Sequence, residues 1–252
     1  MRHSVLILQI ALVSILVGCS TLPKKAIITK THVARAIEME TNFANNSAKF
    51  APPGEAWFEV KHGSSNVLIV APHATRPTRE GKLRFPDGGT GSLAVMLAEL
   101  TDSTVIYTTY ASPSDPNYYD DNEFKRKLAE IIETEQPRLV LDIHASHWYR
   151  PYDVDFGTMN GESIRGNRWI IKSLMSYLKD EGISNFSMNY FAASAHETVT
   201  KFVSQQGIPC IQLEINANYT GHQHDSETVR PQMFAQVLQG LVRFVEHVKQ
   251  TK

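Results

Sequence analysis

The order of strand-like and helix-like segments constrains the fold of this chain more than any other feature of its sequence. Short runs rich in apolar and β-branched residues alternate with longer stretches in which apolar residues recur with the period of a helix. Such alternation is typical of an α/β domain, and it predicts a three-layer α/β/α fold with a mixed, largely parallel central sheet. The predicted strands are residues 56–61, 66–71, 104–110, 138–143, 153–158, 186–191 and 209–216.

The helical period predicts helices between these strands and after the last of them. One helix has a start signal, because Ser194 and Glu197 have the spacing of a capping box, and Gly207 follows its last residue, Gln206. Nothing in the middle of the chain resembles a linker, so residues 51–252 are predicted to form a single domain. The other predicted helices are residues 91–100, 121–136, 166–181 and 227–250.

The first 20 residues form a segment of their own. Arg2 and His3 precede an uncharged run, residues 4–18, which is long for the apolar core of a signal peptide and short for a membrane span. The run ends in LVGC, which resembles the lipobox of bacterial lipoproteins, where cleavage leaves a lipidated cysteine at the new N-terminus. A plain membrane anchor or an ordinary signal peptide is the alternative, although neither explains a cysteine at this boundary.

The lipoprotein resemblance implies a signal peptide over residues 1–18 and a mature chain attached to the membrane of the cell envelope by acyl chains on Cys19. Ser20 then implies sorting to the outer membrane in a Gram-negative cell. Residues 19–50 are polar and mixed, and they predict a tether that contains one short helix. The formal net charge of −1 gives no reason to expect nucleic acid as a partner.

Two histidines have the same position relative to two predicted strands. His73 and His144 lie at or just beyond the carboxyl end of an apolar run, and Asn216 ends a third such run. In open α/β sheets, functional groups gather in the crevice at the carboxyl ends of the strands. Strand alternation also places Asp142 on the same face as His144. Two neutral imidazoles and one carboxylate form the protein half of many catalytic zinc sites, so the two histidines are candidate zinc ligands.

The acidic ligand of such a site has two candidates. Asp87 lies directly before the glycines that lead into a predicted helix. Glu80 lies among basic residues and fits a solvated loop. We favour Asp87 and keep Glu80 as the alternative.

A second carboxylate occupies an unusual place. Glu214 lies near the end of a run that is otherwise apolar enough for a central strand. An isolated charge is costly to bury, so this carboxylate must be paired, bound to a metal or functional. Zinc lowers the pKa of bound water toward ~7, and a neighbouring carboxylate can take that proton and deliver it to a leaving amine. A structural ion pair is the alternative role for Glu214.

Three segments together resemble the N-formylglutamate amidohydrolase family. They are His73 with DGGTGSLA (87–94), LDIHASHWYRPYDVDFGTMNG (141–161) and IQLEINANY (211–219), within a resemblance that spans about residues 55–245. The chain is more distantly similar to zinc carboxypeptidases and phage poly-γ-glutamate hydrolases. The resemblance implies a zinc-carboxypeptidase-like fold, zinc as cofactor and hydrolysis of an amide bond in a small acidic substrate.

The resemblance also implies a role for five residues. His73, Asp87 and His144 correspond to the metal ligands of the family. Glu214 corresponds to the general base and acid. Arg150 corresponds to an arginine suited to hold a substrate carboxylate through its bidentate fork.

The chain departs from the family pattern after both histidines. Ala74 and Thr75 stand where the family often has Gly-Gly or Ser-Gly, Ala145 stands where it often has glycine, and the loop at 74–86 is rich in arginine. The substrate therefore stays open between N-formylglutamate, a glutamyl amide and an envelope peptide. The rival functions are a carboxypeptidase-like peptidase and a non-catalytic envelope lipoprotein that binds a ligand or a partner protein.

Several further residues are most simply explained as surface or core, with a role in the pocket as the alternative. Cys210 lies in an apolar stretch and has no disulfide partner if Cys19 is lipidated, so a buried side chain is favoured over a nucleophile. The other residues of this class are His147, His196, His222, His224, Arg76, Arg79, Arg84, Trp148, Tyr149 and Tyr152.

Overall fold

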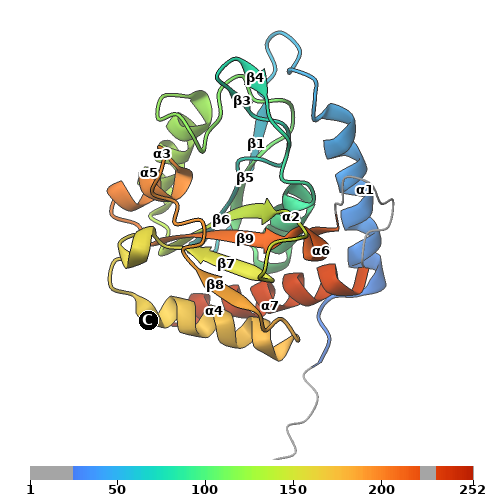
Figure 1. Cartoon of the computed structure of the whole chain (residues 1–252), viewed down its shortest axis with the longest axis vertical. Helices are drawn as coiled ribbons and strands as arrows, with labels where there is room; N and C mark the ends of the chain where they lie inside the picture. The colour runs from blue at the N-terminus through green and yellow to red at the C-terminus, as the bar shows by residue number, and fades with distance from the viewer. Residues whose placement is uncertain (1–24, 222–230, 252) are drawn as a thin grey trace, which may run out of the picture.

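A seven-stranded mixed sheet forms the centre of the computed structural model, which describes residues 25–221 and 231–251 (Figure 1). The strands are β1 (Phe58–Lys61), β2 (Val67–Ala71), β5 (Thr104–Thr108), β6 (Leu139–Ser146), β7 (Val154–Gly157), β8 (Phe186–Met188) and β9 (Cys210–Asn216). Their order in the sheet is β1-β5-β2-β6-β9-β7-β8. The four central strands β5, β2, β6 and β9 are parallel, whereas β1 and β7 run antiparallel to β5 and β9. All seven predicted strands are present, and the predicted sheet type is confirmed.

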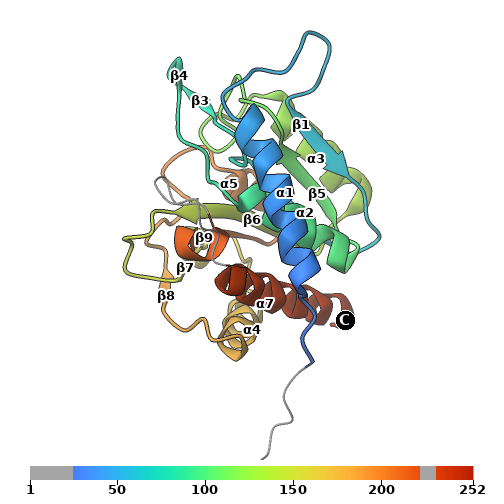
Figure 2. The same cartoon turned by 90° about the vertical axis from the view of Figure 1, so that its right-hand side faces the viewer.

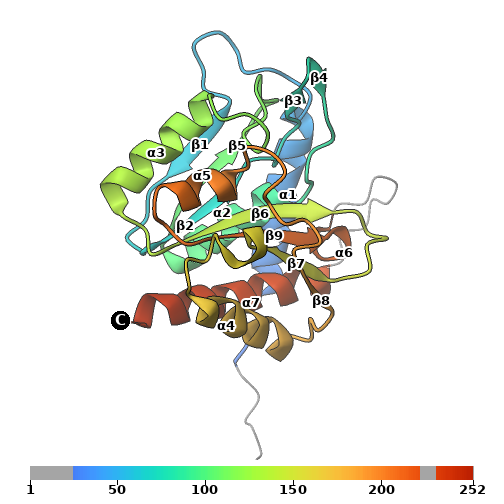
Figure 3. The ribbon, with the colours of Figure 1, turned by 60° about the vertical axis from the view of Figure 1, so that its left-hand side comes forward.

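Helices cover both faces of this sheet (Figures 1 and 3). The first face carries α2 (Thr90–Thr101), α4 (Arg168–Asp180) and α7 (Pro231–Gln250). The second face carries α3 (Glu123–Glu135) and α5 (Val199–Gln205). The sheet and its two helical layers confirm the predicted α/β/α arrangement.

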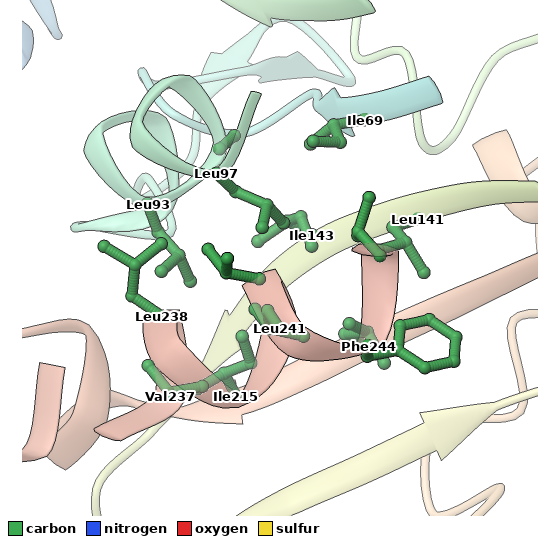
Figure 4. Packing of buried hydrophobic residues seen from close by; sticks show 14 of the residues in the cluster. Ile69, Leu93, Leu97, Leu141, Ile143, Ile215, Val237, Leu238, Leu241 and Phe244 are labelled. Atoms are coloured by element: carbon green, nitrogen blue, oxygen red, sulfur yellow. The ribbon is translucent and has the colours of Figure 1, made fainter. Parts of the chain in front are cut away.

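Alternate residues of one strand contribute to the two separate cores. Leu141 and Ile143 of β6 face the first helical layer, where they pack near Leu93 of α2 and Leu241 of α7 (Figure 4). Val140 belongs to the core on the opposite face. Because both faces are covered, the central strands are apolar almost throughout, with the exception of the residues that form the site described below.

Several predicted element boundaries differ from the structure by a few residues, and the largest consequences concern one strand and one helix. β6 continues to Ser146, so His144 lies within this strand, because pairing with β9 continues to the end of both strands. α5 begins at Val199 rather than at the predicted capping box, because the side chain of Thr198 accepts the hydrogen bond from the backbone N–H of Lys201 and thus caps the helix. The predicted start of the last helix, at residue 227, lies outside the described residues.

The region expected as a tether contains a helix that packs on the domain. This helix, α1 (Lys30–Asn46), has 17 residues and crosses the outer side of α2 (Figure 2). Its buried residues Val33, Ala36 and Phe43 belong to the first core. Gly91 permits the close approach, since a Cβ atom there would lie 2.7 Å from the Phe43 ring. Residues 30–46 are therefore part of the packed structure, which corrects the expected short helix in a tether.

We expect the substitution Phe43→Ala to lower the free energy of unfolding by about 3 kcal/mol, because removing a large aromatic side chain from a core leaves a cavity. Urea denaturation of the two proteins measures this difference. Ile37→Ala on the same helix is the control, since Ile37 is 37% exposed and its loss should change stability little. Equal stability of the Phe43 variant and the parent protein would mean that α1 does not contribute to the core.

None of the helices within residues 25–221 and 231–251 is long and apolar enough to cross a membrane. The predicted signal peptide, residues 1–18, and the predicted lipid attachment site at Cys19 lie outside the described residues. The same is true of His222 and His224.

Candidate metal centre

The loop between β2 and α2 folds back so that His73 and Asp87 become neighbours. A small hairpin formed by β3 (Thr78–Arg79) and β4 (Lys82–Leu83) turns the chain around. The backbone N–H of Asp87 then donates to the carbonyl oxygen of His73 at 2.8 Å. The Thr90 hydroxyl donates to the carbonyl oxygen of Asp87 at 2.6 Å, which holds Asp87 against the first turn of α2. The polar loop thus positions a histidine and an acid beside each other.

Three of the predicted site residues converge at the carboxyl ends of β2 and β6. His73, Asp87 and His144 each offer one ligand atom, and these three atoms lie within 4.8 Å of one another. Oδ2 of Asp87 lies 2.8 Å from Nδ1 of His144 and 3.3 Å from Nδ1 of His73. Glu80, the alternative acid, is exposed and pairs with Arg84 instead. Within the described part of the chain, Asp87 is thus the acid that joins the two histidines.

The Nε2 atom of each histidine contacts a further carboxylate, which is fully buried. Nε2 of His73 lies 2.8 Å from Oδ1 of Asp115, and Nε2 of His144 lies 3.1 Å from Oδ1 of Asp142. These carboxylates are themselves fixed. Arg79 donates two hydrogen bonds to Asp115, and the Thr200 hydroxyl donates one to Asp142.

These hydrogen bonds determine which atoms face the centre of the cluster. A carboxylate only accepts hydrogen bonds, so Nε2 of both His73 and His144 must carry a hydrogen atom. Nδ1 of each neutral imidazole then presents a lone pair. Two such nitrogens and one oxygen of Asp87 therefore form a group of three acceptors facing one another. A cation would satisfy these three acceptors. Two imidazoles, each hydrogen-bonded to a carboxylate, together with one carboxylate ligand form a set that suits zinc.

The pKa shifts of His73, His144 and Asp87 indicate that the cluster favours positive charge. Burial by itself would lower the pKa of His73, but the carboxylates of Asp115 and Asp87 raise it to about 9. The pKa of His144 lies well above its ordinary value for the same reason, because Asp142 and Asp87 outweigh burial. Burial would raise the pKa of Asp87, yet His73 and His144 hold it below its ordinary value. Protons thus neutralise the cluster when no cation does.

Glu214 lies beside this cluster in a cavity of about 550 Å³. Its strand, β9, pairs with β6 so that Glu214 is the direct partner of His144 in the register. Asp87 lines the same cavity. Nε2 of Gln212 donates to the Glu214 carboxylate at 2.9 Å. Burial raises the pKa of Glu214, and although His144 opposes this shift, the pKa reaches about 7.

Arg150 lines the same cavity from the loop after β6. Its guanidinium lies 5.1–5.5 Å from the ring centres of Tyr149, Tyr190 and Phe191, and it donates to the Tyr190 hydroxyl at 3.1 Å. Asn216 fixes the loop, because its side-chain amide donates to three backbone carbonyls of residues 148–152. Asn216 therefore holds the loop that carries Arg150.

The structure separates the remaining candidates by position. Arg76, His147 and Trp148 line the cavity that contains Glu214, while His196 lines a second cavity. Tyr152 and Cys210 are buried in the core. Arg79 and Arg84 also line the second cavity, where Arg79 pairs with Asp115 and Arg84 pairs with Glu80. Tyr149 is exposed and stacks on His147.

Two contributions to the site were missed in the sequence. Asp115 lies seven residues beyond the end of β5, where several acidic and polar residues follow one another without a distinguishing spacing. The C-terminal half of α1 forms one wall of the Glu214 cavity through Glu40, Phe43 and Ser47. The only signal for Asp115 was its place after the carboxyl end of a central strand, which Asp120 and Asp121 share.

No model of a known protein family matches the sequence, and no curated protein matches it significantly. Solved structures do match. N-formylglutamate amidohydrolase from Ralstonia eutropha JMP134 superimposes with a TM-score of 0.58 at 14% identity, covering 78% of this chain and 99% of that one. Glutaminyl cyclase from Porphyromonas gingivalis gives a TM-score of 0.52 at 10% identity, covering 89% and 100%. A gene product from Agrobacterium tumefaciens gives 0.51 at 14% identity, covering 80% and 99%.

These comparisons establish the fold. At 10–14% identity they say nothing about individual residues, and they confirm the resemblance to N-formylglutamate amidohydrolase at the level of architecture.

Proposed function

We propose that this protein is a metal-dependent hydrolase that cleaves an amide bond in a small acidic substrate. His73, Asp87 and His144 would hold the metal, and zinc is the metal that this donor set favours. The observation that carries the proposal is the convergence of three lone-pair acceptors, each imidazole being fixed in that orientation by a buried carboxylate. In a purely structural ion pair both imidazoles would stay protonated toward Asp87, so retention of a metal ion by the purified protein distinguishes the two alternatives.

The residues around this centre suit hydrolysis. A divalent cation at such a site supplies Lewis-acid chemistry, which polarises the scissile carbonyl and acidifies water. Glu214 is placed to take a proton from the attacking water and to give it to the leaving nitrogen. Burial raises the pKa of this carboxyl group above its ordinary value, which favours both transfers near neutral pH.

Arg150 and Arg76 make the cavity suitable for an acidic substrate. Neither guanidinium forms a salt bridge with a carboxylate among the described residues, and both contact aromatic rings instead. The Nε atom of Arg150 is buried without a hydrogen-bond partner. A substrate carboxylate would satisfy this donor through a charge-assisted hydrogen bond.

The location of this activity rests on the sequence alone. We propose that the protein acts in the cell envelope, attached to a membrane through acyl chains on Cys19. Histidine degradation, in which N-formylglutamate arises, takes place in the cytoplasm, so an envelope peptide or glutamyl amide suits this address better.

The proposed activity can be tested with N-acylated glutamate and, for comparison, N-acylated glutamine. The full-length protein is stripped with a chelator, reloaded with Zn²⁺, and assayed for release of the free amino acid. We expect hydrolysis only after reloading, with the glutamate derivative preferred. Absence of metal-dependent hydrolysis would favour the non-catalytic binding lipoprotein instead.

Replacing Arg150 with methionine should raise KM for the acidic amide by roughly 10–100-fold, because a charge-assisted hydrogen bond is lost. The neutral glutamine derivative should be affected far less. Arg165→Met is the matched control, since Arg165 is exposed and does not line the cavity. A uniform loss on both substrates would indicate a structural role for Arg150.

Replacing Asp115 with asparagine should weaken zinc binding by roughly 10–100-fold, since the buried carboxylate fixes the tautomer of His73 and raises its basicity. Competition with a chelating dye measures the affinity. Asp121→Asn is the control, because Asp121 is an exposed residue that pairs only with Arg126 at the surface. Unchanged affinity in the Asp115 variant would mean that His73 is not a ligand or that Asp115 does not support it.

A further inference from the structure

A second cavity shares a wall with the first at the candidate metal centre. The first cavity contains Glu214 and Arg150, whereas the second, of about 460 Å³, contains His73 and His196. Asp87 lines both cavities. Residues of the candidate metal centre therefore border two spaces that differ in their lining.

The position of Glu214 determines which half of an amide substrate occupies the first cavity. A general acid must reach the leaving nitrogen, so the amine half lies on the side of Glu214. Arg150 lines the same cavity and would hold the acidic group of this half. The acyl half must extend away from the scissile bond on the other side, where the second cavity lies.

The size of the second cavity sets the size of the acyl half. In N-formylglutamate the carbonyl carbon carries only a hydrogen atom on this side, which needs no cavity. A volume of about 460 Å³ is more than tenfold the ~30 Å³ that one water molecule occupies in the liquid. The second cavity therefore has room for an acyl group of several atoms.

The lining of the second cavity indicates the chemistry of this group. The lining combines ring side chains with charged ones, and among the rings Tyr118 and His196 lie with centres 4.4 Å apart, while Phe85 lines the same space. Its two arginines are already neutralised, because Arg79 pairs with Asp115 and Arg84 pairs with Glu80. An uncharged group leaves these ion pairs intact and can contact the rings, so it fits such a lining better than a second acid.

We propose that the bond cleaved joins an uncharged acyl group of several atoms, such as the acyl residue of a peptide, to an acidic amine, and that the second cavity binds the acyl group. This inference rests on the proposed hydrolase function. The reaction breaks the C–N bond, forms a C–O bond from water and transfers the proton of that water to the nitrogen. Water is the only co-reactant.

The test compares N-formyl-, N-acetyl- and N-benzoylglutamate, which share the amine half. With the zinc-loaded full-length protein, kcat/KM for the benzoyl compound should exceed that for the formyl compound by at least about tenfold. Isothermal titration calorimetry with the metal-free protein gives a second readout, in which the benzoyl compound should also bind more tightly. Equal values or a preference for formyl in both measurements would overturn the inference.

Two substitutions of His196 assign the preference to the second cavity. His196→Trp narrows the cavity and should lower kcat/KM for the benzoyl compound at least about tenfold more than for the formyl compound. His196→Ala removes a ring and should reduce the same preference. His62→Trp is the control, because His62 is exposed, lies outside both cavities and should leave the ratio unchanged. A ratio unaffected by either His196 variant would place the acyl group elsewhere.

The outcomes separate this inference from the proposed function. If none of the three compounds is hydrolysed with any metal, the hydrolase function fails, and the inference fails with it. If glutamate is released with formyl preferred, the hydrolase function stands and the inference alone is wrong.

Discussion

Replacing His144 with alanine is expected to lower the affinity for Zn²⁺ by at least about 10³-fold. Binding free energies of protein zinc sites are of order 10–16 kcal/mol, so a third of the ligand set accounts for about 4 kcal/mol or more. His144 is also the histidine whose Nδ1 lies nearer to Asp87, at 2.8 Å. The parent protein should retain about one zinc ion per chain after dialysis, and the variant should retain almost none.

The control for this experiment is His62→Ala. His62 has an exposed side chain and pairs with Glu135 far from the site, so its loss should leave the zinc content unchanged. Circular dichroism would show that both variants are folded. Equal zinc content in the His144 variant and the parent would contradict the site, because the three ligand atoms would then not act together.

The strands and the two histidines could be predicted because local pattern and global topology agree at these positions. The strand ending at Ala71 is apolar throughout, and His73 is the first residue beyond it that can bind a metal. Parallel strands bring their carboxyl ends to one edge of the sheet, so His73 and His144 meet there whatever the length of the intervening chain. To predict that His73 and His144 lie close together, it was therefore enough to know that their strands are parallel, which the alternation of strands and helices indicates.

The packing of α1 could not be predicted in the same way, because its own apolar stripe is narrow. Only Val33, Ala36 and Phe43 are buried over its 17 residues. The signal lay in α2, whose residues are apolar on all sides and almost all buried. A helix that is apolar all round must be covered all round, so a further element was needed on its outer side. The sheet covers one side of α2, and α1 covers the other.

The contact between Asp115 and His73 could not be predicted from the sequence either, in contrast to the contact between Asp142 and His144. Asp142 stands two residues before His144 in the same strand, so strand alternation brings the two side chains to one face. Asp115 reaches His73 from a loop 42 residues away in the chain. Nothing in local pattern distinguishes it from Asp120 or Asp121, because only the path of that loop brings it to the site.

Replacing Glu214 with glutamine is expected to lower kcat by roughly 10²–10⁴-fold while the zinc content stays the same, because glutamine keeps the shape of the side chain but cannot carry the proton. Initial rates at saturating substrate together with metal analysis separate these two properties. Glu162→Gln is the matched control, since Glu162 is exposed and lies outside both cavities. Activity within about tenfold of the parent would exclude Glu214 as general base.

The same substitution makes a prediction about stability in the metal-free protein. The pKa of Glu214 rises from its ordinary 4.5 to about 7 on folding, so the folded protein binds a proton that the unfolded chain has already lost between these values. The contribution of Glu214 to the stability of the parent therefore falls as pH rises from about 4.5 to about 7, by roughly 3 kcal/mol in all. Glutamine has no such proton, so the Glu214→Gln protein should match the parent at pH 4.5 and exceed its stability above pH 7.

Zinc should reduce this stability difference, which links the difference to the catalytic role of Glu214. A cation held beside Glu214 favours the ionised carboxylate, so the advantage of glutamine should shrink when Zn²⁺ is added at pH 8. Urea denaturation of both proteins at pH 4.5 and pH 8, with and without Zn²⁺, gives the stability difference under each condition. If the advantage of glutamine were the same at both pH values, folding would not shift the pKa of Glu214 from its ordinary 4.5, and the carboxylate would be ionised at neutral pH. It would then be a poor proton donor to a leaving amine.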